Sequence, residues 1–434
     1  MIVKEYHMKA IHNTSFLCGC FSIKENPVTI TLIDPQWKRI LKTEAEKLML
    51  EKFYYPEFVN FCCLDEASSS GEGIDHYVFP LDINVTLDLS NEKQYTLFVE
   101  NIELFILPYN LLIFAIRVKQ DGSELDDITK SISILRNISD YKENLLLSSW
   151  KNVLAPIKEI YKSNTSSNYN DDTFSYFNLM EYGNKLKLFQ ILEIESIKQS
   201  EQEQDNLLFE LGTLTPINSC GTNSFFSPSS EYFDKIMKNN KISVFNNWKG
   251  LSLFDTFTIL SYSTNSYLRD NWTNYYFSMI YVHSLFLKFY LFQMNMLFRK
   301  KNSKISSLEC EFREFERRCC FHKISYNFLP LEFYRSLDVG LEINEERQKL
   351  YHKLEQEKNI QEKEGDRKMN SLLFYLTCLT IFSTIWDFSC LFNQVYPYEK
   401  SMGSTVFGYR LVTSILFSLT ILSILIYSLA KRRK

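Results

Sequence analysis

The most regular pattern in the chain is a pair of long apolar runs near its C-terminal end. Residues 371–392 (SLLFYLTCLTIFSTIWDFSCLF) and 408–429 (GYRLVTSILFSLTILSILIYSL) are almost wholly apolar or small. A helix of about 22 residues spans a hydrocarbon core of about 30 Å, because each residue adds about 1.5 Å. Core helices of soluble proteins rarely stay apolar on every face for that long. The pattern predicts a hairpin of two transmembrane helices within residues 371–434.

Basic residues predict how this hairpin is oriented. Lys363, Arg367 and Lys368 precede the first span and residues 431–434 (KRRK) follow the second, whereas the connection 393–407 carries a single lysine. Lys and Arg are enriched on the cytoplasmic side of membrane proteins. We therefore expect a multi-pass protein with both termini in the cytoplasm. The start of the chain has no apolar run behind a basic region, so we expect no signal peptide.

A third apolar run, residues 279–298 (MIYVHSLFLKFYLFQMNMLF), is also long enough to be a span. It contains His283, Lys288, Gln293 and Asn295, and polar groups of this kind are costly in lipid. A third span would also move the large N-terminal region to the other side of the membrane from the basic tail. We interpret this run as a buried helix of a soluble body.

A stripe of polar residues follows one face of the first span. It consists of Asn370, Thr377, Thr380, Thr384 and Asp387, which share an arc about 100° wide at about 100° per residue. A carboxyl group deep in a bilayer costs about 2.5–3.5 kcal/mol, so Asp387 should face protein or water. Several copies in a ring would give the stripe a shared aqueous axis, which predicts a cation-attracting pore lined by these residues. The alternative is that the hydroxyls bond their own backbone and Asp387 caps a helix end.

The region before the hairpin has strand patterns first and helical patterns afterwards. Alternating β-branched and aromatic runs predict strands at 76–89, 95–107, 111–119, 207–214 and 251–260, with a turn at 108–110. Helical patterns lie at 125–137, 149–162, 275–300, 304–321 and 331–369, the last running directly into the first span. The predicted fold is an α/β cytoplasmic domain at 1–250, a helical bundle with a stalk helix at 251–370, and the hairpin.

Composition narrows the classes of function. The net charge of −4 gives no reason to expect nucleic-acid binding, which usually requires a basic surface. The sequence has no Gly-rich phosphate loop, no G-x-S-x-G and no H-E-x-x-H, so we expect that the protein is not an enzyme. Its ten cysteines form no Cys-x-x-Cys pair and are interpreted as reduced thiols, and metal ligands are left unassigned.

One aromatic stretch, residues 267–276 (YLRDNWTNYY), offers candidate ligand-binding side chains. These are Arg269, Asp270, Trp272, Tyr275 and Tyr276. An arginine can hold a phosphate, and aromatic rings can stack on a purine. The alternative is a helix start whose aromatic residues belong to the core.

The order of these parts resembles the architecture of the CorA-like superfamily of two-span metal ion channels. The resemblance covers nearly the whole chain and rests on organisation rather than on a motif. In that family the first span lines the pore of a homo-oligomeric ring, usually a pentamer, and a Gly-Met-Asn signature follows it. Here the corresponding residues 392–397 read FNQVYP. The family's selectivity for hydrated magnesium is therefore not carried over to this chain.

A branch of this superfamily that lacks the signature contains the CRISPR-associated CorA-like proteins, membrane effectors of type III CRISPR systems, and the chain is similar to these. The resemblance implies that the soluble domain binds a nucleotide second messenger, a conjugate of S-adenosylmethionine and AMP. It also implies that ion leakage or membrane disruption follows. The many Asn, Lys, Ile and Tyr residues are typical of an AT-rich bacterial genome, so the bacterial inner membrane is the expected location.

Two other functions fit the same pattern. A CorA-type divalent cation transporter would conduct its metal without a nucleotide. A non-conducting, membrane-anchored ligand-binding receptor would not depend on the polar stripe. The expected partners are further copies of the chain in a ring, the lipid bilayer and the nucleotide messenger, and no covalently bound cofactor is expected.

Overall fold

The computed structural model describes residues 8–24, 29–64, 72–89, 93–137, 145–165, 174–195, 200–262, 266–299 and 305–395. The chain divides into two compact units, Met1–Leu354 and Glu355–Lys434. We call the first unit the body. The second unit contains most of one long helix, α12.

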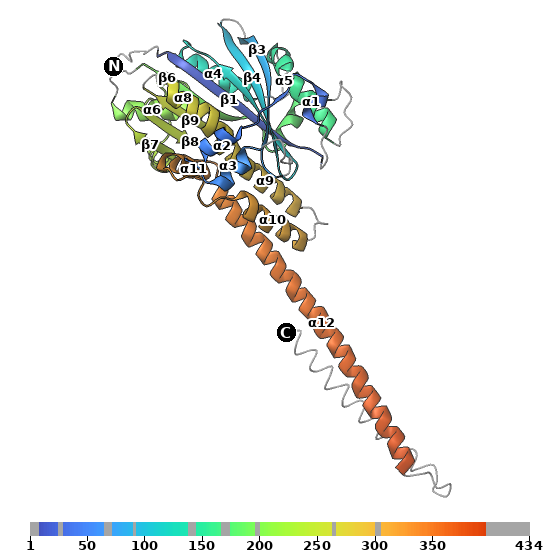
Figure 1. Ribbon diagram of the computed structural model, residues 1–434. Coiled ribbons are helices and arrows are strands. Elements are labelled where there is room, and N and C mark those ends of the chain that lie inside the picture. Colours follow the sequence, from blue (N-terminus) through green and yellow to red (C-terminus); the bar gives the residue numbers. More distant parts are fainter. Residues whose placement is uncertain are drawn as a thin grey trace. The chain divides into compact units, whose positions relative to one another are not determined.

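A mixed sheet of nine strands forms the centre of the body (Figure 1). Its strands, in sheet order, are β2 (Lys38–Arg39), β3 (Asp75–Leu89), β4 (Lys93–Leu107), β5 (Leu111–Lys119), β1 (Ala10–Ser22), β6 (Lys187–Ile194), β9 (Thr256–Ser261), β8 (Trp248–Ser252) and β7 (Lys241–Phe245). Neighbouring strands run antiparallel except for β6 and β9, which are parallel. Parallel neighbours need a long connection, and here the segment from α6 to β8 connects β6 to β9.

The β3–β4–β5 meander confirms the three strands predicted between 76 and 119. Leu107 pairs with Leu111, so residues 108–110 form the turn. Tyr109 and Asn110 both have φ near +60°, the left-handed region that Asn tolerates better than most residues. The central strands β5 and β6 are buried almost along their whole length, because helices cover both faces of the sheet.

One face of the sheet packs on the helices of the first half of the body. The helices of this half and its edges are α1 (Ile30–Ile33), α4 (Leu125–Leu135), α5 (Leu145–Asn164), η2 (Tyr176–Met180), α6 (Glu201–Thr213) and α7 (Ser230–Asn240). Leu97, Phe114 and Leu192 on the strands share this core with Ile128 of α4 and Ile157 of α5. The predicted helices at 125–137 and 149–162 are confirmed.

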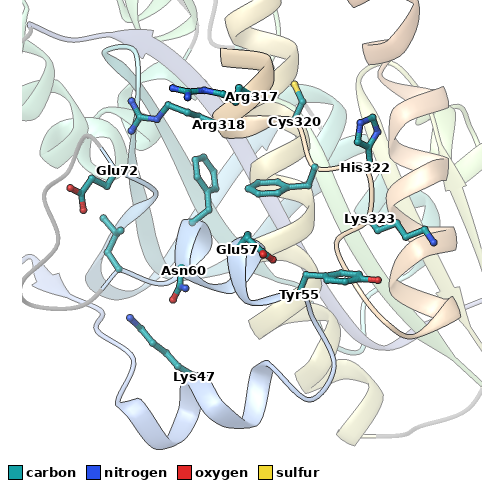
Figure 2. A pocket seen from close by; sticks show the side chains of 13 residues that line it. Lys47, Tyr55, Glu57, Asn60, Glu72, Arg317, Arg318, Cys320, His322 and Lys323 are labelled. Atoms are coloured by element: carbon teal, nitrogen blue, oxygen red, sulfur yellow. The ribbon is translucent and has the colours of Figure 1, made fainter. Parts of the chain in front are cut away.

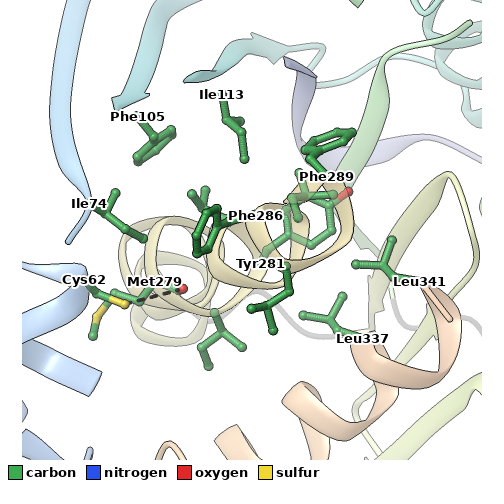
Figure 3. Close-up of a cluster of buried hydrophobic side chains, with 14 of the residues drawn as sticks. Cys62, Ile74, Phe105, Ile113, Met279, Tyr281, Phe286, Phe289, Leu337 and Leu341 are labelled. Carbon is green, nitrogen blue, oxygen red and sulfur yellow. Dashed lines mark hydrogen bonds between the residues drawn. The ribbon is translucent and has the colours of Figure 1, made fainter. Parts of the chain in front are cut away.

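The opposite face packs on a second, aromatic-rich set of helices (Figure 3). They are α2 (Glu44–Leu50), α3 (Pro56–Cys62), α8 (Ser266–Asn271), the π-helix η3 (Trp272–Tyr281), α9 (Val282–Arg299), α10 (Ile305–Cys319) and α11 (Phe328–Gly340). Phe105 and Ile113 of the sheet meet Phe286 of α9 and Leu337 of α11 in this core. The interpretation of residues 279–298 as a buried helix of the body is confirmed, because Val282–Leu291 lie inside the body.

Two predicted strands were wrong or incomplete. Residues 207–214 belong to helix α6, whose start is fixed by a capping box between Ser200 and Glu203. Residues 251–260 contain the end of β8, a turn and β9. The predicted boundary at 250/251 falls inside β8, and the sheet and the helices that follow it belong to one compact unit up to Leu354.

The predicted single helix at 331–369 is two helices. The chain leaves the α-helical conformation at Leu341–Glu342, where Glu342 has a φ of 57°. Gly340, the last residue of α11, packs so closely on β8 that an added Cβ would lie 2.0 Å from the hydroxyl oxygen of Ser252. Helix α12 (Ile343–Val395) then starts in a new direction.

Helix α12 begins inside the body and ends in an apolar segment. Ile343, Leu350 and Leu354 are buried. In the described part of the chain, α12 is the one helix that is long and apolar enough to cross a membrane, and the apolar stretch of it is not buried in the structure. The predicted second span, 408–429, and most of the outer loop lie outside the described residues.

Candidate functional site

Two buried lysines, each paired with a partly exposed carboxylate, lie near the first turn of α12. Lys288 of α9 lies 2.7 Å from a carboxylate oxygen of Glu346 in α12. Lys187, the first residue of β6, lies 2.5 Å from a carboxylate oxygen of Asp255 in the β8–β9 turn. The two ammonium groups lie 4.0 and 4.3 Å from the centroid of the Phe254 ring. Each lysine therefore has both a carboxylate and an aromatic face to compensate for the water it has lost.

The electrostatics of these pairs follow from burial and pairing. Burial lowers the pKa of Lys187, and the carboxylate of Asp255 opposes that shift. Burial raises the pKa of Asp255, but the ammonium of Lys187 outweighs it and the pKa is lowered overall. Arg136, at the end of α4, donates from Nε to the carbonyl oxygen of Leu186 at 2.7 Å. The start of α12 is thus linked through α9 and Phe254 to the middle of the sheet.

A pocket of about 910 Å³ opens on the body between the α2–α3 region and the C-terminal end of α10 (Figure 2). Four cationic and two anionic side chains line it, an excess of two positive charges: Lys47, Arg317, Arg318, Lys323, Glu57 and Glu72. Figure 2 shows Arg317 and Arg318 on one side and Lys47 on the other. Tyr55, Phe61 and Phe321 add aromatic surface between the charges.

Backbone hydrogen bonds hold the two walls of this pocket together. The amide of Tyr55 donates to the carbonyl oxygen of Ile324 at 3.1 Å, and the amide of Tyr326 donates to that of Phe53 at 3.0 Å. The Tyr55 and Tyr326 rings lie 4.2 Å apart. These backbone bonds join the segment before α3 to the segment before α11, so movements of side chains alone do not separate the two sides of the pocket.

Cys320 connects this pocket to α12. It lines the pocket, and Arg347, in the second turn of α12, lies close enough to its thiol to act on it electrostatically. Burial raises the pKa of Cys320 to about 11, although Arg347 opposes the shift, so the group is a neutral thiol at neutral pH. Arg347 also lies near Asp338 of α11, where it opposes the rise in the pKa of that carboxyl caused by burial. A charge placed in the pocket would thus act close to the first turns of α12.

A buried histidine forms the inner side of the same wall. His283 of α9 lies among the rings of Phe58, Phe61 and Phe321, at centroid distances of 5.4 to 5.5 Å. Its Nε2 lies 2.8 Å from the carbonyl oxygen of Cys319 and donates to it. Burial lowers the pKa of His283 to about 4, so the imidazole is neutral at neutral pH. One neutral hydrogen bond therefore ties α9 to the end of α10.

The structure does not bring the five predicted ligand-binding residues to one place. Trp272 and Tyr276 are buried: the Trp272 ring lies 5.4 Å from Trp248, and the Tyr276 ring lies 4.9 Å from Phe333. Arg269 pairs with the buried carboxylate of Glu193 at 3.0 Å. These contacts agree with the alternative given above, in which the aromatic residues belong to the core.

The other two residues of that stretch lie at the surface of the body. Asp270 is exposed, and Tyr275 lies beside a cavity of about 30 Å³, with Lys42 Nζ 5.9 Å from its ring centroid. A cavity of that size admits a water molecule but not a nucleotide.

The polar stripe lies on one exposed face of α12. The hydroxyls of Thr377, Thr380 and Thr384 donate to backbone carbonyl oxygens three or four residues earlier, at 2.7 to 3.0 Å. Asn370 and Asp387 are exposed on the same face. Large apolar side chains occupy the opposite face and are exposed by about two thirds: Tyr375, Leu379, Phe382 and Trp386. Whether the stripe lines a pore stays a prediction.

The basic pocket was not identified from the sequence. Its residues come from positions 47–72 and 317–323, and no spacing rule joins segments so far apart. One local signal was present, the run Arg317-Arg318 followed by Lys323. Cations are common in the last turn of a helix because they complement its dipole, so that signal alone indicates an ordinary helix end.

No family model, curated protein or solved structure matches this chain. Among the described residues no group of three or more His, Cys, Asp or Glu side chains could hold a metal ion. The site is therefore interpreted from its own geometry.

Proposed function

We propose that the chain is a membrane-anchored effector in which the body controls an aqueous path lined by α12 of several copies. The observation that supports this most is that α12 starts among buried residues of the body and runs on as one helix into an exposed apolar segment with a polar face. The hydrogen-bonded backbone makes such a helix stiff, so a displacement at its first turns is carried along its length.

In this proposal residues 408–429 form a second span, and both termini lie on the cytoplasmic side of a bacterial inner membrane. The stripe from Asn370 to Asp387 faces the axis of a ring of copies, and the carboxylates of Asp387 attract cations near its outer end. A ligand opens such a path only if it binds the open and closed states unequally. The Lys288–Glu346 pair is suited to that switching, because one partner belongs to α9 and the other to α12.

The resemblance to CRISPR-associated CorA-like effectors extends this proposal to a signal and an output. The signal is a conjugate of S-adenosylmethionine and AMP, and the output is ion leakage that stops an infected cell. In this role the protein is not an enzyme, and it uses no covalently bound cofactor.

We expect the full chain in liposomes to admit ions when this conjugate is added, and so to change the fluorescence of a trapped ion-sensitive dye. Replacing both Thr384 and Asp387 by leucine should abolish the ion flux, because the path would then have no polar lining at its outer end. The flux is followed by the fluorescence of the dye at a fixed ratio of protein to lipid.

The matched control replaces Phe382 by leucine on the opposite face of α12, which should leave the ion flux unchanged. Ion flux without any nucleotide would indicate a CorA-type cation transporter instead. Absence of ion flux under every condition contradicts the proposal.

A second candidate function is a non-conducting, membrane-anchored receptor. It is favoured by the threonine hydroxyls of α12, which already bond to their own backbone and so do not need water as a partner. In a receptor of this kind the body binds its ligand normally, but the leucine replacements at 384 and 387 change nothing.

A further inference from the structure

We infer that the basic pocket between α3 and α10 binds a phosphate-bearing ligand whose remaining part is flat or apolar. The pocket offers about 910 Å³, within the size range of sites for small molecules. The inference concerns a site away from the aromatic stretch 267–276. Its link to opening of the membrane path rests on the proposed function, whereas binding itself does not.

The charges of the pocket select an anion. Arg317 and Lys323 have no ion-pair partner among the described residues, so an incoming phosphate would not have to displace a carboxylate from them. Arg317 presents a planar guanidinium, which matches phosphate oxygens in a bidentate manner. Lys47 is buried but also lines the pocket, and Figure 2 shows it on the side of the pocket opposite Arg317.

The uncharged surface of the pocket selects the rest of the ligand. Tyr55 and Phe321 are half-buried, so part of each ring is free to contact a ligand. Asn60 of α3 is exposed and lines the pocket, and its side-chain amide adds a hydrogen-bond donor and an acceptor. A flat ring beside Tyr55 or Phe321, with its phosphate at Arg317 or Lys323, would use both kinds of surface.

The helix-end explanation does not cover the whole pocket. Arg317 and Arg318 lie in the last turn of α10, where any cation is favoured by the helix dipole. Lys47 lies in the last turn of a different helix, α2, and Lys323 follows α10 in no helix, so they bring positive charge to the same space from two further segments. Positive charge converges there from three segments, which a helix end alone does not require.

The position of the pocket gives the ligand a route to α12. Cys320 lines the pocket, and Arg347 of α12 lies close enough to its thiol to act on it electrostatically. A phosphate in the pocket would attract Arg347 and change how that side chain is shared among Cys320, Asp338 and the ligand. Binding would thereby favour one position of the first turns of α12 over another.

The test uses three separate probes: ATP and pyrophosphate are added to the full chain in detergent, and phosphatidylglycerol vesicles are added to the full chain in detergent-free discs of uncharged lipid. We expect ATP or pyrophosphate to bind, and Arg317→Ala and Lys323→Ala each to weaken binding at least tenfold. Arg313→Ala is the matched control, because Arg313 is exposed one turn earlier in α10 and pairs with Glu309. It should leave the affinity unchanged, and thermal unfolding of each variant checks that it is folded.

A second readout is local and independent of the membrane. A bound phosphate should slow alkylation of Cys320 and leave alkylation of the exposed Cys310 unchanged, because a nearby negative charge disfavours the thiolate. Binding by the lipid vesicles alone, with the same sensitivity to Arg317→Ala, would identify a lipid headgroup as the source of the phosphate. Absence of binding by all three probes, or binding that Arg317→Ala and Lys323→Ala leave unchanged, overturns the inference.

The leak assay separates this inference from the proposed function. If the variants lose phosphate binding but ion flux into the liposomes is unaffected, the pocket binds its ligand without controlling α12. If binding is present and no ion flux occurs under any condition, the inference about the pocket holds and the proposed membrane function is contradicted.

Discussion

Replacing Gly340 by alanine is expected to lower the free energy of unfolding of the body by about 1–3 kcal/mol. A Cβ at this position would lie 2.0 Å from the hydroxyl oxygen of Ser252 and 2.7 Å from its carbonyl carbon. The hydroxyl can rotate away, but the backbone of β8 cannot, so α11 has to move off the sheet. Alanine is the better helix former, which makes destabilisation the opposite of what propensity predicts.

Two comparison variants make this prediction specific. Gly365 lies in α12 with no atom within 4 Å of an added Cβ, so Gly365→Ala should stabilise its helix or leave the protein unchanged. Adding Ser252→Gly to Gly340→Ala removes two of the three close contacts and should restore part of the lost stability. Denaturant unfolding of the full chain in detergent measures all three. Equal stability of Gly340→Ala and wild type would contradict the close packing of α11 on β8.

Acidification is expected to cost the body about 3 kcal/mol through His283 alone. The pKa of this imidazole falls from its ordinary 6.5 to about 4 because it is buried. Between these values the unfolded chain binds a proton that the folded chain does not bind, so stability rises with pH in this window. The contribution is therefore complete above pH 6.5 and is lost progressively as the pH falls through about 4. At about 1.4 kcal/mol per pKa unit, a shift of about 2.5 units gives this magnitude.

The comparison with His283→Gln isolates this contribution. Glutamine has an amide that can donate to the carbonyl oxygen of Cys319, but it does not titrate. Burial raises the pKa of Glu311 and Asp338, and these carboxyls change stability with pH in the opposite sense. Both carboxyls are present in wild type and in His283→Gln, so their contributions cancel in the difference between the two unfolding free energies. Unfolding free energies measured from pH 7 to pH 4 should fall more steeply for wild type, and parallel curves would contradict a neutral, buried His283.

The parts of the fold that were predictable are those in which local pattern and burial agree. The β3–β5 meander has β-branched and aromatic strands separated by short polar turns, and each strand lies where that pattern indicates. The helix at 282–299 was identifiable because its polar residues, such as Lys288, need protein partners, and the structure provides Glu346.

The errors occur where tertiary contacts overrule the local pattern. Residues 207–214 (LLFELGTL) are apolar enough for a strand, yet the capping box at Ser200 and packing against β8 and β9 make them helical. Nothing in the composition of 331–369 marks the break at Glu342, which lies two residues after the close contact between Gly340 and Ser252. That contact joins segments about 90 residues apart, beyond the reach of any local rule.

The candidate sites also divide into those set by a local sequence pattern and those set by tertiary contacts. The stripe on α12 is a periodic pattern within one helix, so the sequence identified its members. The aromatic stretch 267–276 was attractive by residue type, but Trp272 and Tyr276 are used in packing. The basic pocket needed the fold itself, because backbone hydrogen bonds between residues 53–55 and residues 324–326 bring its two sides together.

Thiol accessibility along α12 tests the central claim, that its polar face looks onto water inside the membrane. Single cysteines replace Thr377, Thr380 or Thr384 on one face, and Tyr375 or Phe382 on the other, in a chain whose Cys378 and Cys390 are changed to serine. Each variant is placed in lipid vesicles and treated with a charged thiol reagent that does not cross the bilayer, and the labelled peptide is identified by mass spectrometry. The account predicts labelling at 377, 380 and 384 and protection at 375 and 382. Protection at all three threonine positions, or faster labelling at 375 and 382, would contradict it.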